Sequence, residues 1–216
     1  MPDLSFQVVG ADVTPYAMVP LLTFRLRVTN ASADEAIYNV VLRCQIQIET
    51  TRRKYQPEEE KRLRDLFGEP ERWGQTLRAM LWTHASVVVA PFTGETIAQV
   101  PVSCSYDFNV AATKYFYALE DGEIPLDFLF SGSVFYQDTQ GALQVSPISW
   151  TQEARFRLPV ATWKQLMEAY YPNTAWVQLR RDVFDRLYQY KVDQGIPTWE
   201  QAIERILPPV NVGAPA

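Results

Sequence analysis

Apolar and polar side chains alternate along several stretches of the first 158 residues. The clearest of these is residues 37–49, where the alternation runs from Val40 onward. The apolar positions are Val40, Leu42, Cys44, Ile46 and Ile48, and the polar positions are Arg43, Gln45, Gln47 and Glu49. A period of two puts alternate side chains on opposite faces of a β-strand, so we predict a strand with one buried face and one solvent-facing face.

The same pattern recurs along most of this region, at residues 4–8, 22–29, 81–89, 97–108, 124–136, 143–150 and 155–158. In residues 81–89, Thr83 and Ala85 fall on one side and Trp82 on the other. An interruption around Gly132 indicates a β-bulge. Seven or eight strands with half-solvated faces are typical of antiparallel sheets. We therefore predict a mainly β protein with α-helices, whose residues 1–158 form an immunoglobulin-like antiparallel β-sandwich.

Residues 57–67 carry the signals of a short helical insertion between strands. Pro57 suits the first helical position, acidic residues follow it, basic residues come later, and Gly68 closes the segment. The charged surface of this helix has two interpretations. It is either a solvated face in a strand connection or a docking surface for a partner.

After Pro159 the apolar spacing changes from that of strands to that of helices. Residues 159–208 are predicted to form a C-terminal segment of two or three helices packed on the sandwich. The expected N-caps of these helices are Thr162, then Asn173 or Thr174, then Thr198. The last residues, 209–216, are predicted to be a disordered tail.

Composition narrows the classes of protein to which the chain can belong. The net charge of −5 and the pI near 5.0 argue against nucleic-acid binding and against an anionic membrane surface. No stretch reaches about 18 uninterrupted apolar residues, so no membrane span is expected. The N-terminus lacks the pattern of a signal peptide, and we expect a cytoplasmic protein.

Few residues could carry chemistry. The chain has a single histidine, His84, on a predicted strand, and no serine lies in a nucleophile motif. Cys44 and Cys104 fall on the apolar sides of their strands, which indicates buried thiols or, alternatively, a disulfide between the sheets. A zinc site would need both cysteines, His84 and a carboxylate to converge, and their spacing does not favour one. No metal or cofactor is expected.

The remaining candidates are carboxylates and aromatic side chains. Asp121 and Glu123 flank Gly122, and such a pair is typical of an exposed turn, although an acid–base pair would also look like this. Trp176 and Trp199 belong to the C-terminal aromatic stripes, which are either core or a partner surface. The site candidates are therefore His84, Cys44, Cys104, Asp121 and Glu123, and none is assigned a catalytic role.

The whole chain resembles a bacterial family of unknown function. The resemblance rests on PDLSF at residues 2–6, LRVTN at 26–30, LRCQIQIE at 42–49, LFGEPERWG at 66–74, LWTH at 81–84, ALEDGEIPL at 118–126, LFSGSVFY at 129–136 and PTWEQA at 197–202. Genes of this family are often found near those of NiFe uptake hydrogenases. The resemblance implies an accessory role beside such a redox complex, and it assigns no active-site residues.

Three functional hypotheses follow. The first is a non-enzymatic interaction or assembly protein with a protein partner. The second is an enzyme or small-ligand-binding protein with a pocket between the sandwich and the helices, using His84 or the carboxylates at residues 120–123. The third is metal delivery through Cys44, Cys104 and His84.

Overall fold

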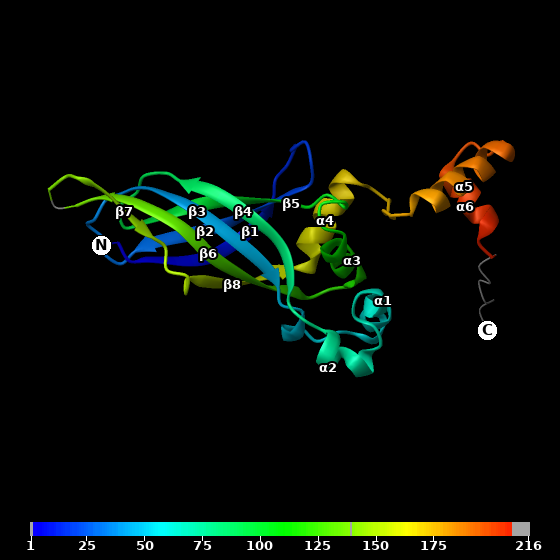
Figure 1. The fold of residues 1–216 in the computed structure, drawn as a ribbon, viewed down its shortest axis with the longest axis horizontal. Coiled ribbons are helices and arrows are strands. Elements are labelled where there is room, and N and C mark those ends of the chain that lie inside the picture. The colour runs from blue at the N-terminus through cyan, green and yellow to red at the C-terminus, as the bar shows by residue number, and fades with distance from the viewer. Residues whose placement is uncertain (1, 139, 209–216) are drawn as a thin grey trace. The chain divides into compact units, whose positions relative to one another are not determined.

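The structure is a computed structural model that describes residues 2–138 and 140–208, and it divides the chain into two compact units (Figure 1). Unit 1 extends to Thr174, and unit 2 begins at Ala175. Each unit is described by itself.

Unit 1 contains two antiparallel sheets. The first has the order β1-β2-β5, with bounds Leu4–Val13, Leu21–Asn30 and Glu95–Ser103. The second has the order β4-β3-β6-β7, with bounds Met80–Val89, Ile37–Ile48, Glu123–Gln137 and Leu143–Pro147. A further strand, β8 (Glu153–Pro159), pairs with the first half of β6. The prediction of a mainly β protein with antiparallel sheets is confirmed.

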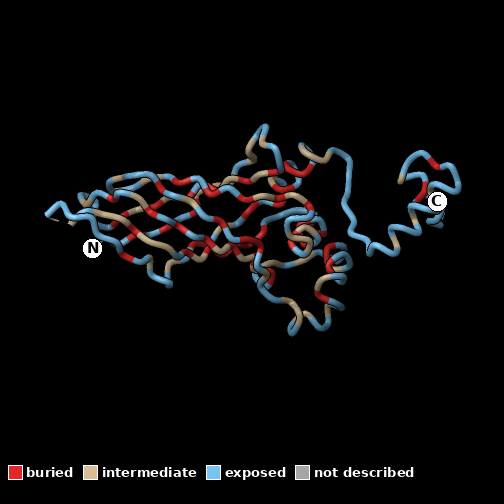
Figure 2. The backbone as a smooth tube through the Cα atoms, turned by 45° about the horizontal axis from the view of Figure 1, so that its top comes forward, coloured by how far each residue is buried: buried red, intermediate tan, exposed pale blue. Residues whose placement is uncertain are grey.

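The inner faces of the two sheets share one hydrophobic core. Strand β3 lies between β4 and β6, and its alternate apolar residues are buried, as the sequence pattern predicts (Figure 2). Phe6 of β1 stacks on Phe130 of β6 with 4.6 Å between ring centroids. Phe24 of β2 meets Phe128 of β6 edge to face at 5.0 Å. Burying side chains of this size stabilises the fold by about 2–3 kcal/mol each.

The predicted bulge at Gly132 is wrong. The register between β3 and β6 runs unbroken past this point, with Leu42 opposite Gly132. Gly132 marks the place where the outer partner of β6 changes from β8 to β7. Its φ is 137°, and a Cβ atom there would lie 2.0 Å from the carbonyl oxygen of Val41. The glycine is needed for a left-handed conformation and for a close approach of two backbones, not for an extra residue.

An irregularity appears instead in β4. Its register with β3 passes from Thr83 opposite Ile46 directly to Leu81 opposite Gln47, so Trp82 is an extra residue. Trp82 and Thr83 are therefore both buried, whereas Leu81 is exposed. Strict alternation placed Trp82 on the wrong face because a bulge changes the phase of the side chains.

Four helices gather at one end of the sheets in unit 1 (Figure 1). They are α1 (Pro57–Phe67), α2 (Trp73–Thr76), α3 (Val110–Ala118) and α4 (Val160–Tyr170), and short 3-10 turns lie at Thr50–Arg52 and Pro70–Arg72. Helix α1 coincides with the range expected from the sequence, and a capping box between Gln56 and Glu59 opens it. Helix α4 begins at Val160 directly after β8, so Thr162 lies inside the helix and is not its cap.

Unit 2 is a helical hairpin of α5 (Arg181–Asp193) and α6 (Trp199–Ile206). The cap expected at Thr198 is confirmed, because its hydroxyl accepts a hydrogen bond from the Gln201 amide at 3.2 Å. The cap expected at Asn173 or Thr174 is wrong, because α5 begins only at Arg181. Within residues 175–208, only Ile196 and Ala202 are buried (Figure 2).

Two expectations about the C-terminal region stay predictions. One is that residues 159–208 pack as a whole on the sheets. The other, a disordered tail at 209–216, lies outside the described residues. Within the part of the chain that is described, no helix has both the length and the apolar character that crossing a membrane requires.

Candidate functional site

His84 lies on the exposed side of β4, opposite Gln45 of β3. It lines neither of the two pockets described below. His84 therefore shares neither pocket with Asp121 or Glu123.

Both cysteines are buried and free. Cys44 lies in the middle of β3, and Cys104 follows the end of β5. Burial raises the pKa of each thiol to about 12, so both are protonated and unreactive at neutral pH. The inter-sheet disulfide is not formed. Within residues 2–138 and 140–208, no group of three or more His, Cys, Asp or Glu side chains is placed to hold a metal ion.

Asp121 and Glu123 line a polar pocket of about 550 Å³, here called the arginine pocket. Its basic side chains are Arg52, Arg53, Lys54 and Arg157, and its acidic side chains are Glu59, Asp121 and Glu123. Arg53 donates hydrogen bonds to the main-chain carbonyls of Asp121 at 2.8 Å and Glu123 at 2.9 Å. The turn is thus held through its backbone, and both carboxylates remain exposed.

The centre of this pocket is a buried ion pair between Arg53 and Glu59, with 2.5 Å between nitrogen and oxygen. Their side chains are 8% and 0% exposed. Glu59 also accepts hydrogen bonds from the Gln56 amide at 3.0 Å and the Glu120 amide at 2.8 Å. The pair therefore ties the start of α1 to the turn before β6. Arg53 is therefore a structural residue, although it lies in a run of three basic residues, 52–54.

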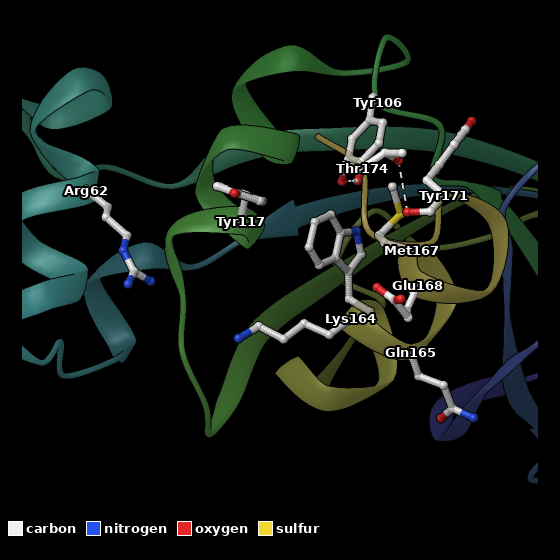
Figure 3. Close-up of a pocket in the computed structure, with 10 residues that line it drawn as sticks. Arg62, Tyr106, Tyr117, Lys164, Gln165, Met167, Glu168, Tyr171 and Thr174 are labelled. Atoms are coloured by element: carbon white, nitrogen blue, oxygen red, sulfur yellow. Dashed lines mark hydrogen bonds between the residues drawn. The ribbon is translucent and has the colours of Figure 1, made fainter. Parts of the chain in front are cut away.

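A second pocket of about 690 Å³, here called the helical pocket, lies between α3 and α4 (Figure 3). Its aromatic and apolar lining is Tyr106, Tyr117, Trp163, Met167 and Tyr171. Its polar lining is Arg62, Lys164, Gln165, Glu168 and Thr174. This volume falls within the range of small-molecule sites, which are typically about 300–1,000 Å³.

The floor of the helical pocket is anchored in the core. Trp163 is 4% exposed and packs against Phe116 of α3 with 5.5 Å between centroids. Phe116 in turn meets Trp82 edge to face at 5.0 Å. Helix α3 is fixed by Asn109, whose carboxamide donates to the Trp82 carbonyl at 2.9 Å and accepts from the Ala112 amide at 3.0 Å. Because both helices are held by the core, the pocket is preformed.

One wall of the helical pocket is a pair of stacked tyrosines. The rings of Tyr106 and Tyr171 are 4.8 Å apart, and the Tyr106 hydroxyl donates to the Thr174 carbonyl at 3.3 Å. Burial is the main cause that raises the pKa of Tyr106, with smaller contributions from the nearby Tyr117, Tyr171 and Glu168. The phenol is therefore a neutral hydrogen-bonding group over the physiological pH range.

Charged groups lie at both ends of the helical pocket (Figure 3). At one end, Lys164 donates to the Glu120 carbonyl at 2.7 Å, and Arg62 donates to the Glu120 carboxylate at 3.0 Å. Toward the tyrosine wall, the Glu168 carboxylate accepts from the Asn173 amide at 3.3 Å. The first end holds two cations and one carboxylate, so it has a net positive charge.

Sequence reasoning missed this pocket. Its lining comes from α1, α3, α4, the segment after β5 and the segment after α4. Trp163 and Met167 have the spacing of an ordinary core face, and Tyr106 has the phase of a core strand. None of these signals distinguishes a pocket floor from a closed core. Of the predicted acidic cluster at residues 120–123, only Glu120 takes part, by holding the two cations.

Comparison with known proteins gives a family but no activity. No curated protein sequence matches the chain. Among solved structures, the CARDB domain of a Pyrococcus furiosus protein in complex with di-metal ions is 13% identical, with a TM-score of 0.29, and the match covers 73% of this chain and 92% of that domain. A protein described as late embryogenesis abundant is 13% identical, with a TM-score of 0.33, and the match covers 74% of this chain and 73% of the other. Scores this low give no information about function. The sequence profile of DUF6084, a family of unknown function, matches residues 1–213, and the chain belongs to that family.

Proposed function

We propose that the chain is a non-enzymatic interaction protein, an accessory or assembly factor whose unit 2 binds a protein partner and whose unit 1 is the scaffold. We also propose that the two sheets of unit 1 are an immunoglobulin-like sandwich. Their shared core and antiparallel pairing support this assignment.

The observation that carries the functional proposal is an apolar stripe on unit 2. On α5, Phe184, Tyr188 and Val192 recur every four residues and are all exposed. On α6, Ile203 and Ile206 are exposed as well. Residues three or four apart lie on the same face of a helix, so each helix presents a continuous apolar surface.

A helical hairpin of this kind is too small to be stable without further burial. Segments below about 40 residues usually need a disulfide, a metal or association with another chain. Unit 2 contains no cysteine or histidine. Exposed contiguous apolar patches are typical of protein interfaces, and aromatic residues carry much of the binding energy there. A partner that covers the stripe would provide the missing burial.

The partner surface is best placed on unit 2 alone. Helix α1 already buries its apolar residues Leu63 and Phe67 within unit 1. Its outer surface is occupied by ion pairs, such as Lys61 with Glu58 at 2.6 Å and Arg62 with Glu120 at 3.0 Å. The resemblance to a family encoded near NiFe uptake hydrogenases makes such a hydrogenase the first partner to test.

The test is purification of the tagged full-length chain from its native host, with quantitative mass spectrometry of the eluate. We expect one protein complex to be recovered in a fixed ratio with the wild-type chain. The variant Phe184→Asp/Tyr188→Asp should reduce that recovery by at least about tenfold, because charges on the stripe oppose burial.

The matched control is Arg186→Asp. This residue is two positions from both Phe184 and Tyr188 and therefore lies on another face of α5. It receives the same acidic side chain, and recovery of the complex should be unchanged. Purification of the wild-type chain alone as a monomer, or equal recovery with all variants, contradicts the proposal.

A further inference from the structure

The helical pocket combines an aromatic interior with a positively charged end, and this combination indicates the chemical class of ligand that would fit. Tyr117 is 60% exposed and Trp163 only 4%, so the pocket has an accessible aromatic rim above a buried aromatic floor. Lys164 extends from α4 toward the side on which α1 carries Arg62 (Figure 3). Both cations are positioned by their hydrogen bonds to Glu120.

We propose that the helical pocket binds a small aromatic carboxylate. The aromatic ring would lie against Trp163 and Tyr117, and the carboxylate would meet Lys164 and Arg62. The inference does not depend on the proposed partner binding of unit 2, because every residue it uses belongs to unit 1.

The charges at the cationic end favour an anion. An ammonium has three N–H donors and a guanidinium has five, and each group donates one of the hydrogen bonds to Glu120 described above. Both therefore keep donors for a ligand. Two cations against one carboxylate leave about one positive charge, which a single carboxylate on the ligand neutralises. The Glu168 carboxylate, which also lines the pocket, accepts a hydrogen bond from the Asn173 amide, whereas Lys164 donates to the Glu120 carbonyl.

The interior of the pocket favours an aromatic group over a flexible aliphatic one. Tyr106 and Tyr171 already stack in the wall, and Met167 adds a thioether to the lining that also contains Trp163. Ring–ring contacts contribute about 0.5–1.5 kcal/mol beyond the burial of area. Thioethers also make favourable contacts with aromatic rings. A rigid ring also loses less conformational entropy on binding than an alkyl chain does.

Isothermal titration calorimetry on the full-length protein tests the proposal with three matched probes. Indolepropionate has the ring and the carboxylate, indolepropionamide keeps the ring without the charge, and decanoate keeps the charge without the ring. We expect indolepropionate to bind at least about tenfold more tightly than the amide, because hydrogen bonds to charged groups are the stronger ones. It should also bind more tightly than decanoate.

Variants locate the binding. Lys164→Gln and Arg62→Gln should each reduce the preference for the acid over the amide by at least about threefold, and Tyr117→Ala should weaken both indole probes by about threefold. The control Lys61→Gln removes the same charge from the next position of α1, outside the pocket, and should leave all affinities unchanged. All four positions are largely exposed or at the surface, and circular dichroism will show whether each variant is folded.

The proposal is overturned by any of three results. The first is no binding of indolepropionate to the wild-type protein. The second is equal affinity for the acid and the amide, which would remove the role of the cations. The third is binding that Lys164→Gln, Arg62→Gln and Tyr117→Ala all leave unaffected, which would place the ligand elsewhere.

Discussion

Phe116 in unit 1 and Phe184 in unit 2 are both members of aromatic clusters on helices, but their surroundings differ. Phe116 lies against Trp82 and Trp163 and is 1% exposed. Phe184 packs against Trp199 with 5.4 Å between centroids, yet it remains 42% exposed. In unit 1 a strand and a second helix cover the ring. In unit 2 a single neighbouring helix covers one side only. An aromatic cluster therefore becomes core only where elements from several directions close over it.

Truncating each of these two rings gives the most direct test of this comparison. Phe116→Ala should lower the free energy of unfolding by about 4 kcal/mol, because it removes a buried ring and leaves a cavity. Phe184→Ala should change it by less than about 1 kcal/mol, because the ring is only partly buried. Urea denaturation followed by circular dichroism measures both. Equal losses would mean that unit 2 is covered to the same extent as unit 1.

A second comparison within unit 1 concerns two neighbouring carboxylates of α1. Glu59 is completely buried in its ion pair with Arg53, whereas Glu58 pairs with Lys61 in solvent. Glu59→Gln should cost about 3 kcal/mol, because it leaves the Arg53 charge buried without a counter-charge. Glu58→Gln should leave the free energy of unfolding nearly unchanged, since exposed pairs contribute little. Chemical denaturation measures the free energy of unfolding of both variants. Similar small losses in the two would show that water reaches the pair of Arg53 and Glu59.

The smallest expected effect is a pH dependence that belongs to unit 1, where both cysteines lie. Each thiol ionises near 9.0 when unperturbed, and burial raises its pKa to about 12. Between these values the folded chain binds more protons than the unfolded chain, so stability is full below pH 9 and falls as the pH rises. The decrease approaches about 1.4 kcal/mol per pH unit for each thiol.

The variant Cys44→Ala/Cys104→Ala separates this effect from the other groups that ionise at alkaline pH. Tyr55, for example, also has its pKa raised to about 12 by burial. Urea midpoints between pH 8 and 10 should therefore decline less steeply in the variant than in the wild type. The slopes are compared rather than the absolute stabilities, because the variant also loses packing. Identical slopes would show that the thiols are hydrated in the folded protein.

Much of the fold was predictable because its signals are local. The alternation along β3, the proline, acids and glycine that bound α1, and the threonine that caps α6 all depend on nearest neighbours along the chain. The predictions from the sequence were wrong where a single residue departs from the regular alternation of a strand. Trp82 was placed on the wrong face because a bulge shifts the phase, and Gly132 was taken for a bulge when the close approach of β3 demands it.

The candidate site was not predictable in the same way. Tyr106, Trp163 and Tyr171 meet only because α4 returns to the end of the sheets from which α3 also projects. Arg53 lies in a run of basic residues that resembles a solvated surface, and only the fold supplies Glu59 and the carbonyls of the turn before β6.

Most strands and helices, and the apolar faces they carry, could be predicted from the chain alone, because they follow from periodicity and from end signals a few residues long. Only the folded chain shows which apolar faces are covered, which charges are buried and where a pocket remains. These outcomes depend on contacts between residues far apart in the chain. An apolar stripe has the same appearance in a sequence whether it faces a core, a pocket or a partner.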